Sequence, residues 1–456
     1  MTDASKDFKF TLKVMIDKKK EKVLFAESDC QFVDVLLSFL TLPLGRIIKA
    51  LNEHYVNAPI IGSLTNLYRS LAGIDNADFV TDDAKEILLN PRSPFEAEYG
   101  MLKLSITDSQ PTKYLRCACG NSSHTVSIYY DQVKCQKCPS SYVVKIDLPI
   151  KESKVCEGVF TANRSSFIIS DDLQIFPSVT GICHIVSLLG ITNMDEAEAF
   201  DVKIGFNQIM NLLMGSFVSQ TPLSYFLLNR TILPLGLEQT SVIPDEFQEK
   251  VGAEKMVLKV FIQRSKSKVL YALAEDDFVE FLFTFFVIPL GGVEHLLEGK
   301  TCIKAIDNLQ RSVADLIGDR YFNSPVMKSK LMKPNLVHGS ISEHHLFPLS
   351  QEGMNPNKHE KFKFSSLAFP KGQGRYLEGP IAYMVTDDLT VNPVCIHSAI
   401  SFLREKNIPM SDVKEIEVQV GLKEALSILR ASLTSTSALT DALLNSMPIK
   451  QPKTEA

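Results

Sequence analysis

A stretch of 43 residues occurs twice in this chain. Residues 9–51 align without a gap with residues 255–297, at an offset of 246, and 18 of the 43 positions are identical. An internal repeat limits the possible folds more than any single motif, because both copies must form the same kind of unit. In each copy, two apolar segments around a polar turn predict a β-hairpin, and apolar residues at helical spacing then predict a helix.

The repeat continues beyond the hairpin and the helix. Further pairs of matching segments are 64–71 with 306–313, 88–91 with 331–334, 170–177 with 386–393, 203–213 with 419–429, and 221–228 with 437–444. We therefore expect an α+β fold built by tandem duplication of a β-hairpin-plus-helices unit, with pseudo-twofold symmetry. The expected boundaries are 8–240 for the first copy, 241–254 for a linker, 255–447 for the second copy and 448–456 for a flexible tail.

Composition excludes several classes of protein. The net charge of −5 and pI near 6.0 give no electrostatic basis for a nucleic-acid-binding protein as a whole. The first ten residues lack the features of a signal peptide. The most apolar run, 281–293, is shorter than the roughly 20 residues of a membrane span, and we expect it to be a buried helix. Nine cysteines without a signal peptide indicate a reducing compartment, the cytoplasm or the nucleus.

Four cysteines form the one motif with a defined chemistry. Cys117 and Cys119 make a C-x-C pair, and Cys135 and Cys138 make a C-x-x-C pair 15 residues later. Four thiolates can close a tetrahedral structural zinc site. Residues 124–130 read as a strand, so the cysteines would lie at the ends of a zinc-ribbon-like hairpin over 113–142, with His124 as a substitute ligand or an exposed strand residue. Unliganded cysteines or a redox pair are the alternatives.

The cysteine segment is expected to be an insertion into the first copy. From Pro91 to Asp171 there are 80 positions, whereas from Pro334 to Asp387, the matching residues, there are 53, which is 27 fewer. An insertion of this size has little core and needs a metal or another staple. A four-cysteine site has no open coordination position, which argues against metal catalysis there.

No nucleotide-binding, hydrolase or metalloprotease motif is present in the sequence, so no catalytic residue is predicted. The pairs at 171–172 and 387–388 are acidic in both copies, and we interpret Asp171 and Asp387 as turn or helix-cap residues rather than a catalytic pair. The histidines at 344, 345 and 359 are interpreted as loop residues.

The matching segments share few polar positions with functional potential. These are Asn66 with Asn308 and Arg69 with Arg311. They could form a functional site, or a buried polar network that locks the helix onto the hairpin.

The chain resembles a plant-specific family known as domain of unknown function 674 (DUF674). The motifs that carry the resemblance are LKVMIDKKKEKVLFAESDCQFVDVLLSFLTLPLG (Leu12–Gly45), LNPRS (Leu89–Ser93), VTDDLTVNP (Val385–Pro393) and GLKEALSILRASLTSTSALTDALL (Gly421–Leu444). The resemblance covers essentially the whole chain. It implies a plant protein inside the cell, with cysteine pairs at the same place, and it implies no activity, substrate or catalytic residue.

Three functions remain open at this point. The first is a non-enzymatic binding or interaction protein with a structural zinc site, for which a protein is the expected partner. The second is an enzyme or small-molecule binder whose site lies between the two copies and uses Asp171, Asp387, Arg69 and Arg311. The third is nucleic-acid binding through the zinc hairpin by its basic residues, Lys113, Arg116, Lys134 and Lys137.

Overall fold

The computed structural model describes most of the chain. The described residues are 7–108, 114–119, 125–127, 134–135, 138–146, 158–162, 165–191, 197–228, 255–316, 319–337, 340–351, 366–367 and 375–444. We call residues 7–228 the first half and residues 255–444 the second half. The expected linker and tail lie outside the described residues.

Each half contains one antiparallel sheet of five strands. In the first half the order is β7-β6-β2-β1-β8, and in the second half it is β13-β12-β10-β9-β14. The strands of the first sheet are β1 (Phe10–Asp17), β2 (Lys22–Asp29), β6 (Ser166–Ser170), β7 (Ile175–Pro177) and β8 (Ala197–Ile204). Those of the second are β9 (Met256–Gln263), β10 (Lys268–Ala274), β12 (Tyr383–Thr386), β13 (Val391–Pro393) and β14 (Val413–Val420). The predicted hairpins are β1-β2 and β9-β10.

The hairpins form where the sequence alternates between apolar and polar residues. In β1, Phe10, Leu12 and Val14 point to the core and the residues between them are exposed, as the period of two requires. The hairpin turns contain Glu21 and Ser267, which occupy aligned positions and both have a left-handed backbone, with φ of 48° and 49°. The two turns therefore have similar local geometry.

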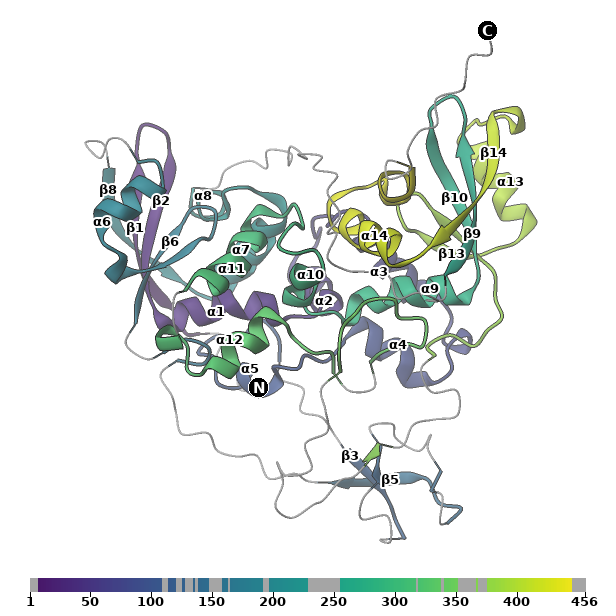
Figure 1. Ribbon diagram of the computed structural model, residues 1–456, viewed down its shortest axis with the longest axis horizontal. Helices are drawn as coiled ribbons and strands as arrows, with labels where there is room; N and C mark the ends of the chain where they lie inside the picture. The colour runs from purple at the N-terminus through teal and green to yellow at the C-terminus, as the bar shows by residue number, and fades with distance from the viewer. Residues whose placement is uncertain are drawn as a thin grey trace.

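The helices lie mainly between the two sheets, which are at opposite ends of the molecule (Figure 1). Those of the first half are α1 (Cys30–Thr41), α2 (Leu44–His54), α3 (Leu64–Gly73), η2 (Asn76–Asp78), α4 (Asp82–Leu89), α5 (Glu96–Tyr99), η3 (Ser178–Thr180), α6 (Ile182–Leu188), α7 (Phe206–Val218) and α8 (Pro222–Leu227). Those of the second half are α9 (Asp276–Phe283), η4 (Thr284–Val287), α10 (Leu290–Leu296), α11 (Lys304–Asp315), η5 (Asp319–Tyr321), α12 (Pro325–Met332), α13 (Ile396–Glu405), η7 (Met410–Asp412), α14 (Leu422–Thr434) and η8 (Thr440–Leu444). None of the described helices is long and apolar enough to cross a membrane.

The two halves meet at a pair of aligned prolines, Pro43 and Pro289, which form an antiparallel bridge. Beside it, the amide of Leu44 donates to the carbonyl of Ile288 at 3.0 Å, and the amide of Leu290 donates to that of Leu42 at 2.9 Å. These two hydrogen bonds are reciprocal between aligned positions. One continuous hydrophobic core surrounds them and includes both halves.

Gly45 allows two helices of the first half to approach each other closely. Helix α1 ends at Thr41, and Gly45 lies in the first turn of α2. A Cβ at Gly45 would lie 2.8 Å from the carbonyl oxygen of Leu88, so the glycine allows α4 to approach closely. The aligned Gly291 is 3.1 Å from the carbonyl oxygen of Leu331 by the same measure.

Residues 281–293 are buried, as predicted, but they do not form one helix. Helix α9 ends at Phe283, η4 follows, and α10 begins at Leu290 after Pro289. Proline lacks the amide hydrogen that a continuous helix would need. All residues of this run are buried because they pack between the two halves.

Helices α3 and α11 pack on the sheet of the opposite half. Helix α3 contacts β13 of the second sheet, and α11 contacts β7 of the first. The amide of Val391 donates to the hydroxyl oxygen of Ser70, and the amide of Ile175 donates to that of Ser312, each at 2.9 Å. Each helix is therefore fastened to the sheet of the opposite half rather than to that of its own half. Sequence could not distinguish the two arrangements, because they bury the same residues against equivalent strands.

The cysteine segment forms a small module below the helical layer in Figure 1. Its strands are β3 (Tyr114–Cys117), β4 (Thr125–Val126) and β5 (Tyr142–Ile146), and β11 (Ser366–Leu367) of the second half pairs in parallel with β4. The predicted strand 124–130 is thus described only as β4 and the bridging Ser127. The cysteines are carried mainly by β3 and the segment before β5.

Candidate functional site

The four predicted cysteines converge. The sulfur atoms of Cys117, Cys119, Cys135 and Cys138 all lie within 4.8 Å of one another. The Sγ atom of Cys117 is 3.1 Å from that of Cys138 and 3.4 Å from that of Cys119, and Cys119 and Cys135 are 4.0 Å apart. A zinc ion with four bonds of about 2.3 Å requires sulfur atoms about 3.8 Å apart. The spacing of the sulfur atoms therefore fits a single tetrahedral metal ion.

The local structure explains how a C-x-C pair reaches the site. Strand β3 ends at Cys117, and a bulge between Arg116 and Cys117 interrupts its pairing with β5. A tight turn then brings the Cys119 sulfur back toward Cys117. The amide of Cys119 donates to the Cys117 sulfur at 3.5 Å. His124 lies outside the described residues.

The chemistry of the cluster suits metal ligation. The close Cys117 sulfur and a backbone hydrogen bond from Ser140 lower the pKa of the Cys138 thiol to about 6. The amide of Cys119 lowers the pKa of Cys117, but the contacts with Cys138 and the other thiols outweigh it and raise that pKa to about 12. The pair therefore shares one proton at neutral pH, with the thiolate on Cys138. Four sulfur ligands suit zinc or iron, and they leave no position for a substrate or a reactive water. The arrangement can hold a metal ion but cannot use it as a Lewis acid.

The acidic residues predicted to cap helices do so. The carboxylate of Asp171 accepts hydrogen bonds from the amide and the hydroxyl of Ser224, in the first turn of α8. The aligned Asp387 accepts from the amide of Thr440, at the start of η8. Burial raises the pKa of both carboxyl groups. The two residues serve separate halves and do not form a paired site.

The two predicted arginines have different surroundings. The guanidinium of Arg311 donates to the side-chain oxygen of Asn308 at 3.0 Å. Arg69 is exposed and has no hydrogen-bond or ion-pair partner within the described part of the chain. It borders a cavity of about 460 Å³ between α3 of the first half and β13 of the second. Of the four residues predicted for a site between the copies, Arg69 alone lines this cavity.

The family model for "Protein of unknown function (DUF674)" matches residues 6–421 and 354–455 of the chain. The chain belongs to this family. The match spans both sheets and the cysteine module, so the resemblance predicted from the motifs is confirmed. No curated protein and no solved structure matches the chain. Membership of DUF674 assigns no activity, so any function must be inferred from the residues.

Sequence reasoning on this DUF674 protein missed a pair of buried acids at aligned positions. The carboxylate of Asp34, in α1, accepts hydrogen bonds from the amides of Val159, Phe160 and Thr161. Glu280, in α9, accepts from two consecutive amides, at residues 376 and 377. The signal was an acidic residue flanked on both sides by apolar residues in each helix, within the segments FVDVLL and FVEFLF. Each acid fastens a distant loop to the core.

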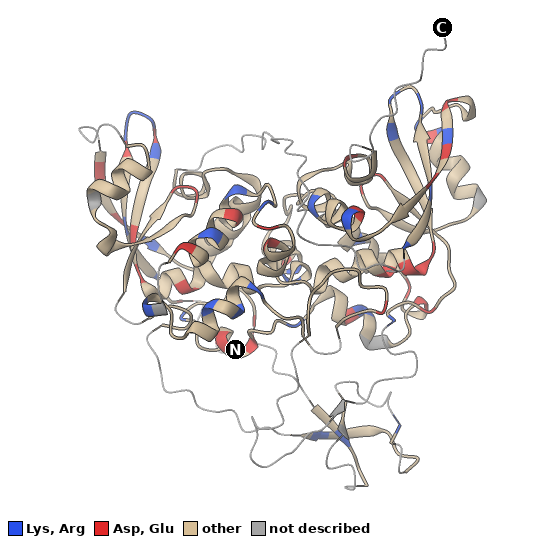
Figure 2. Ribbon diagram, in the orientation of Figure 1, with Lys and Arg blue, Asp and Glu red and all other residues tan. Residues whose placement is uncertain are grey.

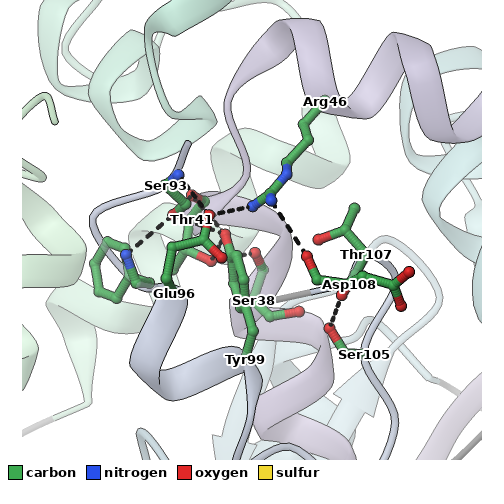
Figure 3. A network of polar contacts seen from close by, with 10 residues as sticks. Ser38, Thr41, Arg46, Ser93, Glu96, Tyr99, Ser105, Thr107 and Asp108 are labelled. Atoms are coloured by element: carbon green, nitrogen blue, oxygen red, sulfur yellow. Dashed lines mark hydrogen bonds and ion pairs between the residues drawn. The ribbon is translucent and has the colours of Figure 1, made fainter. Parts of the chain in front are cut away.

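A buried arginine network was also missed. Arg46 is 2% exposed, and its guanidinium forms a 2.6 Å ion pair with Glu96 and donates to the carbonyl of Asp108 (Figure 3). Tyr99 lies beside it and bonds to the hydroxyl groups of Thr41 and Ser93. The aligned residue in the second half is Gly292. This network belongs to the first half and holds the segment that precedes the cysteine module.

The histidines predicted as loop residues are partly buried. His344 lies 4.0 Å from the buried carboxylate of Glu280 and 3.6 Å from the exposed carboxylate of Glu343. Burial lowers the pKa of His345 to about 4, so this histidine is neutral at physiological pH. His359 lies outside the described residues. The Cys117–Cys138 cluster is the only set of three or more possible metal ligands among the residues that the structure describes.

Proposed function

We propose that this protein is a non-enzymatic binding protein whose cysteine module is held by one structural zinc ion, bound by Cys117, Cys119, Cys135 and Cys138. The observation that carries the proposal is the convergence of the four sulfur atoms within 4.8 Å. A closed set of sulfur ligands supports a structural role rather than catalysis. Thiol ligands also suit the reducing environment of the cytoplasm or the nucleus, which we propose as the location.

The small size of the module is a physical reason for a metal. Its own hydrophobic cluster consists of Leu115, Cys117, Cys135 and Tyr142, with Ile87 of α4 packed against it. Two of its strands, β4 and β11, have two residues each. A core this small does not offset the conformational entropy lost on folding, whereas a zinc ion bound to four thiolates does.

We further propose that the two halves arose by tandem duplication, with copies at 8–240 and 255–447 and the module inserted at 113–142. The support is the matching strand order and the reciprocal hydrogen bonds at aligned positions. One further example concerns the last helices: the amide of Val23 donates to Ser224, and the aligned amide of Val269 donates to Thr440. Unrelated units would not be expected to share contacts at this level of detail.

Metal analysis of the purified protein tests the zinc proposal. We expect about one zinc per chain in the wild type and a marked loss in Cys135→Ser. Cys183→Ser is the matched control, because Cys183 is exposed and lies outside the cluster. A wild type without metal after expression in zinc-replete medium would refute the metal site, and a stoichiometric iron content would refute zinc as the metal.

Two observations favour other binding functions. The cavity between α3 and β13 favours a small-molecule site between the halves, which is the second candidate function. The described part of the cysteine module carries Arg116, Lys134 and Lys145 and no acidic residue, which favours contact with an anion such as nucleic acid. Over the residues that the structure describes, acidic and basic side chains are intermixed (Figure 2).

Binding to single-stranded RNA and DNA oligonucleotides tests the nucleic-acid alternative. Dissociation constants at two salt concentrations for wild type and Arg116→Ala/Lys134→Ala would show a steep salt dependence that the double variant reduces. Affinity that is equal in both proteins would exclude the module as the binding surface.

A further inference from the structure

The cavity between α3 and β13 has one wall from each half. One face of α3, with Asn66, Arg69, Ser70 and Gly73 at helical spacing, forms the first wall. Residues 390–393, which include β13, form the second wall, and Ile74, Asp75 and Asp78 complete the lining. The volume of about 460 Å³ is within the range of small-molecule sites.

The walls are fixed by contacts that do not fill the cavity. Ser70 accepts from the amide of Val391 at 2.9 Å, and Asn66 donates to the carboxylate of Asp388 at 3.2 Å. The backbone of the end segment is also held, because the amide of Glu378 donates to the carbonyl of Asp78 at 2.8 Å. The lining is thus formed before any ligand binds.

The charged groups at the cavity have unused binding capacity. The guanidinium of Arg69 has no partner within the described residues, although the aligned Arg311 is bonded to Asn308. Asp75 uses one oxygen to cap η2, and no ion pair links either Asp75 or Asp78 to another described residue. One cation and two anions therefore face a cavity whose apolar part includes Ile74 and Val391.

The arrangement of charge selects a class of ligand. A planar guanidinium binds a carboxylate through two parallel hydrogen bonds. Two carboxylates beside it attract ammonium or guanidinium groups and repel further anions. A ligand with one carboxylate and two cationic groups complements all three residues, whereas a dicarboxylate or a diamine complements only part of the set.

We propose that this cavity binds a free basic amino acid, with its carboxylate on Arg69 and its two cationic groups on Asp75 and Asp78. The proposal rests on the second candidate function, small-molecule binding between the halves, and is independent of zinc. Gly73 leaves room for the aliphatic part of the ligand, because a Cβ at this position would meet no atom within 4 Å.

Calorimetric titration of the full chain with L-lysine and L-arginine tests the proposal. We expect saturable binding that Arg69→Ala and Asp78→Asn each weaken by about tenfold or more, since each removes a charge-assisted contact. Arg311→Ala is the matched control, at the aligned position outside the cavity, and should bind as the wild type does.

Gly73→Leu provides a variant that fills the cavity without unfolding the protein. Gly73 ends α3 with an ordinary backbone conformation and open space beyond it, so leucine should leave the melting temperature unchanged or raise it. We expect this variant to lose binding of L-lysine. Retained binding with wild-type affinity would place the ligand elsewhere and overturn the proposal.

Two further probes, succinate and cadaverine, test whether the cavity binds small molecules even if a basic amino acid is the wrong ligand. If either binds in a manner that depends on Arg69 or Asp78 while L-lysine does not, the basic amino acid is wrong and the small-molecule function stands. If no probe and no basic amino acid binds, the ligand class and the second candidate function are both refuted. The zinc content of the protein is unaffected by either result.

Discussion

At the scale of single residues, the chain places polar groups where they fasten distant backbone segments. Asp34 and Glu280 each hold a loop that lies far along the sequence, and Asp171 and Asp387 each hold the start of a helix. A buried carboxylate is tolerated only when its oxygen atoms accept hydrogen bonds. These acids are therefore explained by architecture and need no catalytic role.

The first prediction concerns the pH dependence contributed by Asp34. Burial raises its pKa from 3.8 to about 6, so the unfolded chain releases this proton near pH 4 and the folded chain near pH 6. The folded state binds more protons between these values, and its stability from this group falls as the pH rises through them, by about 3 kcal/mol in total. In urea titrations at pH 4 to 7, the unfolding free energy of the wild type minus that of Asp34→Asn should therefore decrease as the pH rises.

Glu27→Gln is the control for this measurement, because Glu27 is an exposed carboxylate on the neighbouring strand β2. Its difference from the wild type should vary little over the same range. A difference for Asp34→Asn that is constant, or that grows with pH, would contradict the raised pKa.

The second prediction compares two aligned serines. Ser312 is 5% exposed and accepts the amide of Ile175, so Ser312→Ala leaves a buried amide without a partner and should cost about 1–3 kcal/mol of unfolding free energy. Ser70 accepts the amide of Val391 at the edge of the cavity, where water can replace the hydroxyl. Ser70→Ala should therefore cost less. Equal losses of unfolding free energy in denaturant titrations would contradict this prediction and show that water reaches neither amide.

At the scale of elements, local sequence patterns predicted the hairpins and helices but not the long-range contacts between them. Alternation and helical spacing identified both hairpins and the helices that follow, because these signals depend on neighbouring residues. The spacing of the cysteines identified their convergence for the same reason. The sheet on which α3 and α11 pack, the close approach at Gly45 and the partner strand β11 of the module all depend on distant residues. These lie from 43 positions away, for Gly45 and Leu88, to 321 positions away, for Ser70 and Val391. A single sequence contains no periodic signal for such contacts.

The third prediction concerns the cysteine module as one element. If a metal ion stabilises the module, removal of zinc with a chelator should raise the rate of amide hydrogen exchange in β3 and β5 while β1 and β9 remain protected. The expected selectivity follows from the separate hydrophobic cluster of the module. Exchange that rises equally in the five-stranded sheets would show that the metal stabilises the whole molecule. Cys395→Ser, outside the cluster, should behave as the wild type does.

At the scale of the whole molecule, each half contributes a helix that packs against the other half. Helix α11 packs against α1, α7 and β7 of the first half, and α3 packs against α9 and β13 of the second. The hydrophobic core is continuous across the contact between Pro43 and Pro289. The boundary between the repeats in the sequence is therefore not a boundary between independent domains in space.

The fourth prediction follows from this exchange of helices. A fragment of residues 1–240 would keep the first sheet but lose α11, which covers α1 and supplies Ser312 to the amide of Ile175. A fragment of residues 241–456 would lose α3 in the same way, together with Ser70. Each fragment exposes an apolar face that the other normally buries, so neither should show a cooperative thermal transition alone.

Co-expressed fragments should associate into a 1:1 complex that unfolds cooperatively, because every exchanged contact can form between the two chains. A cooperative transition in either isolated fragment would show that the halves fold as separate domains, and that their contact adds stability without being required for the fold.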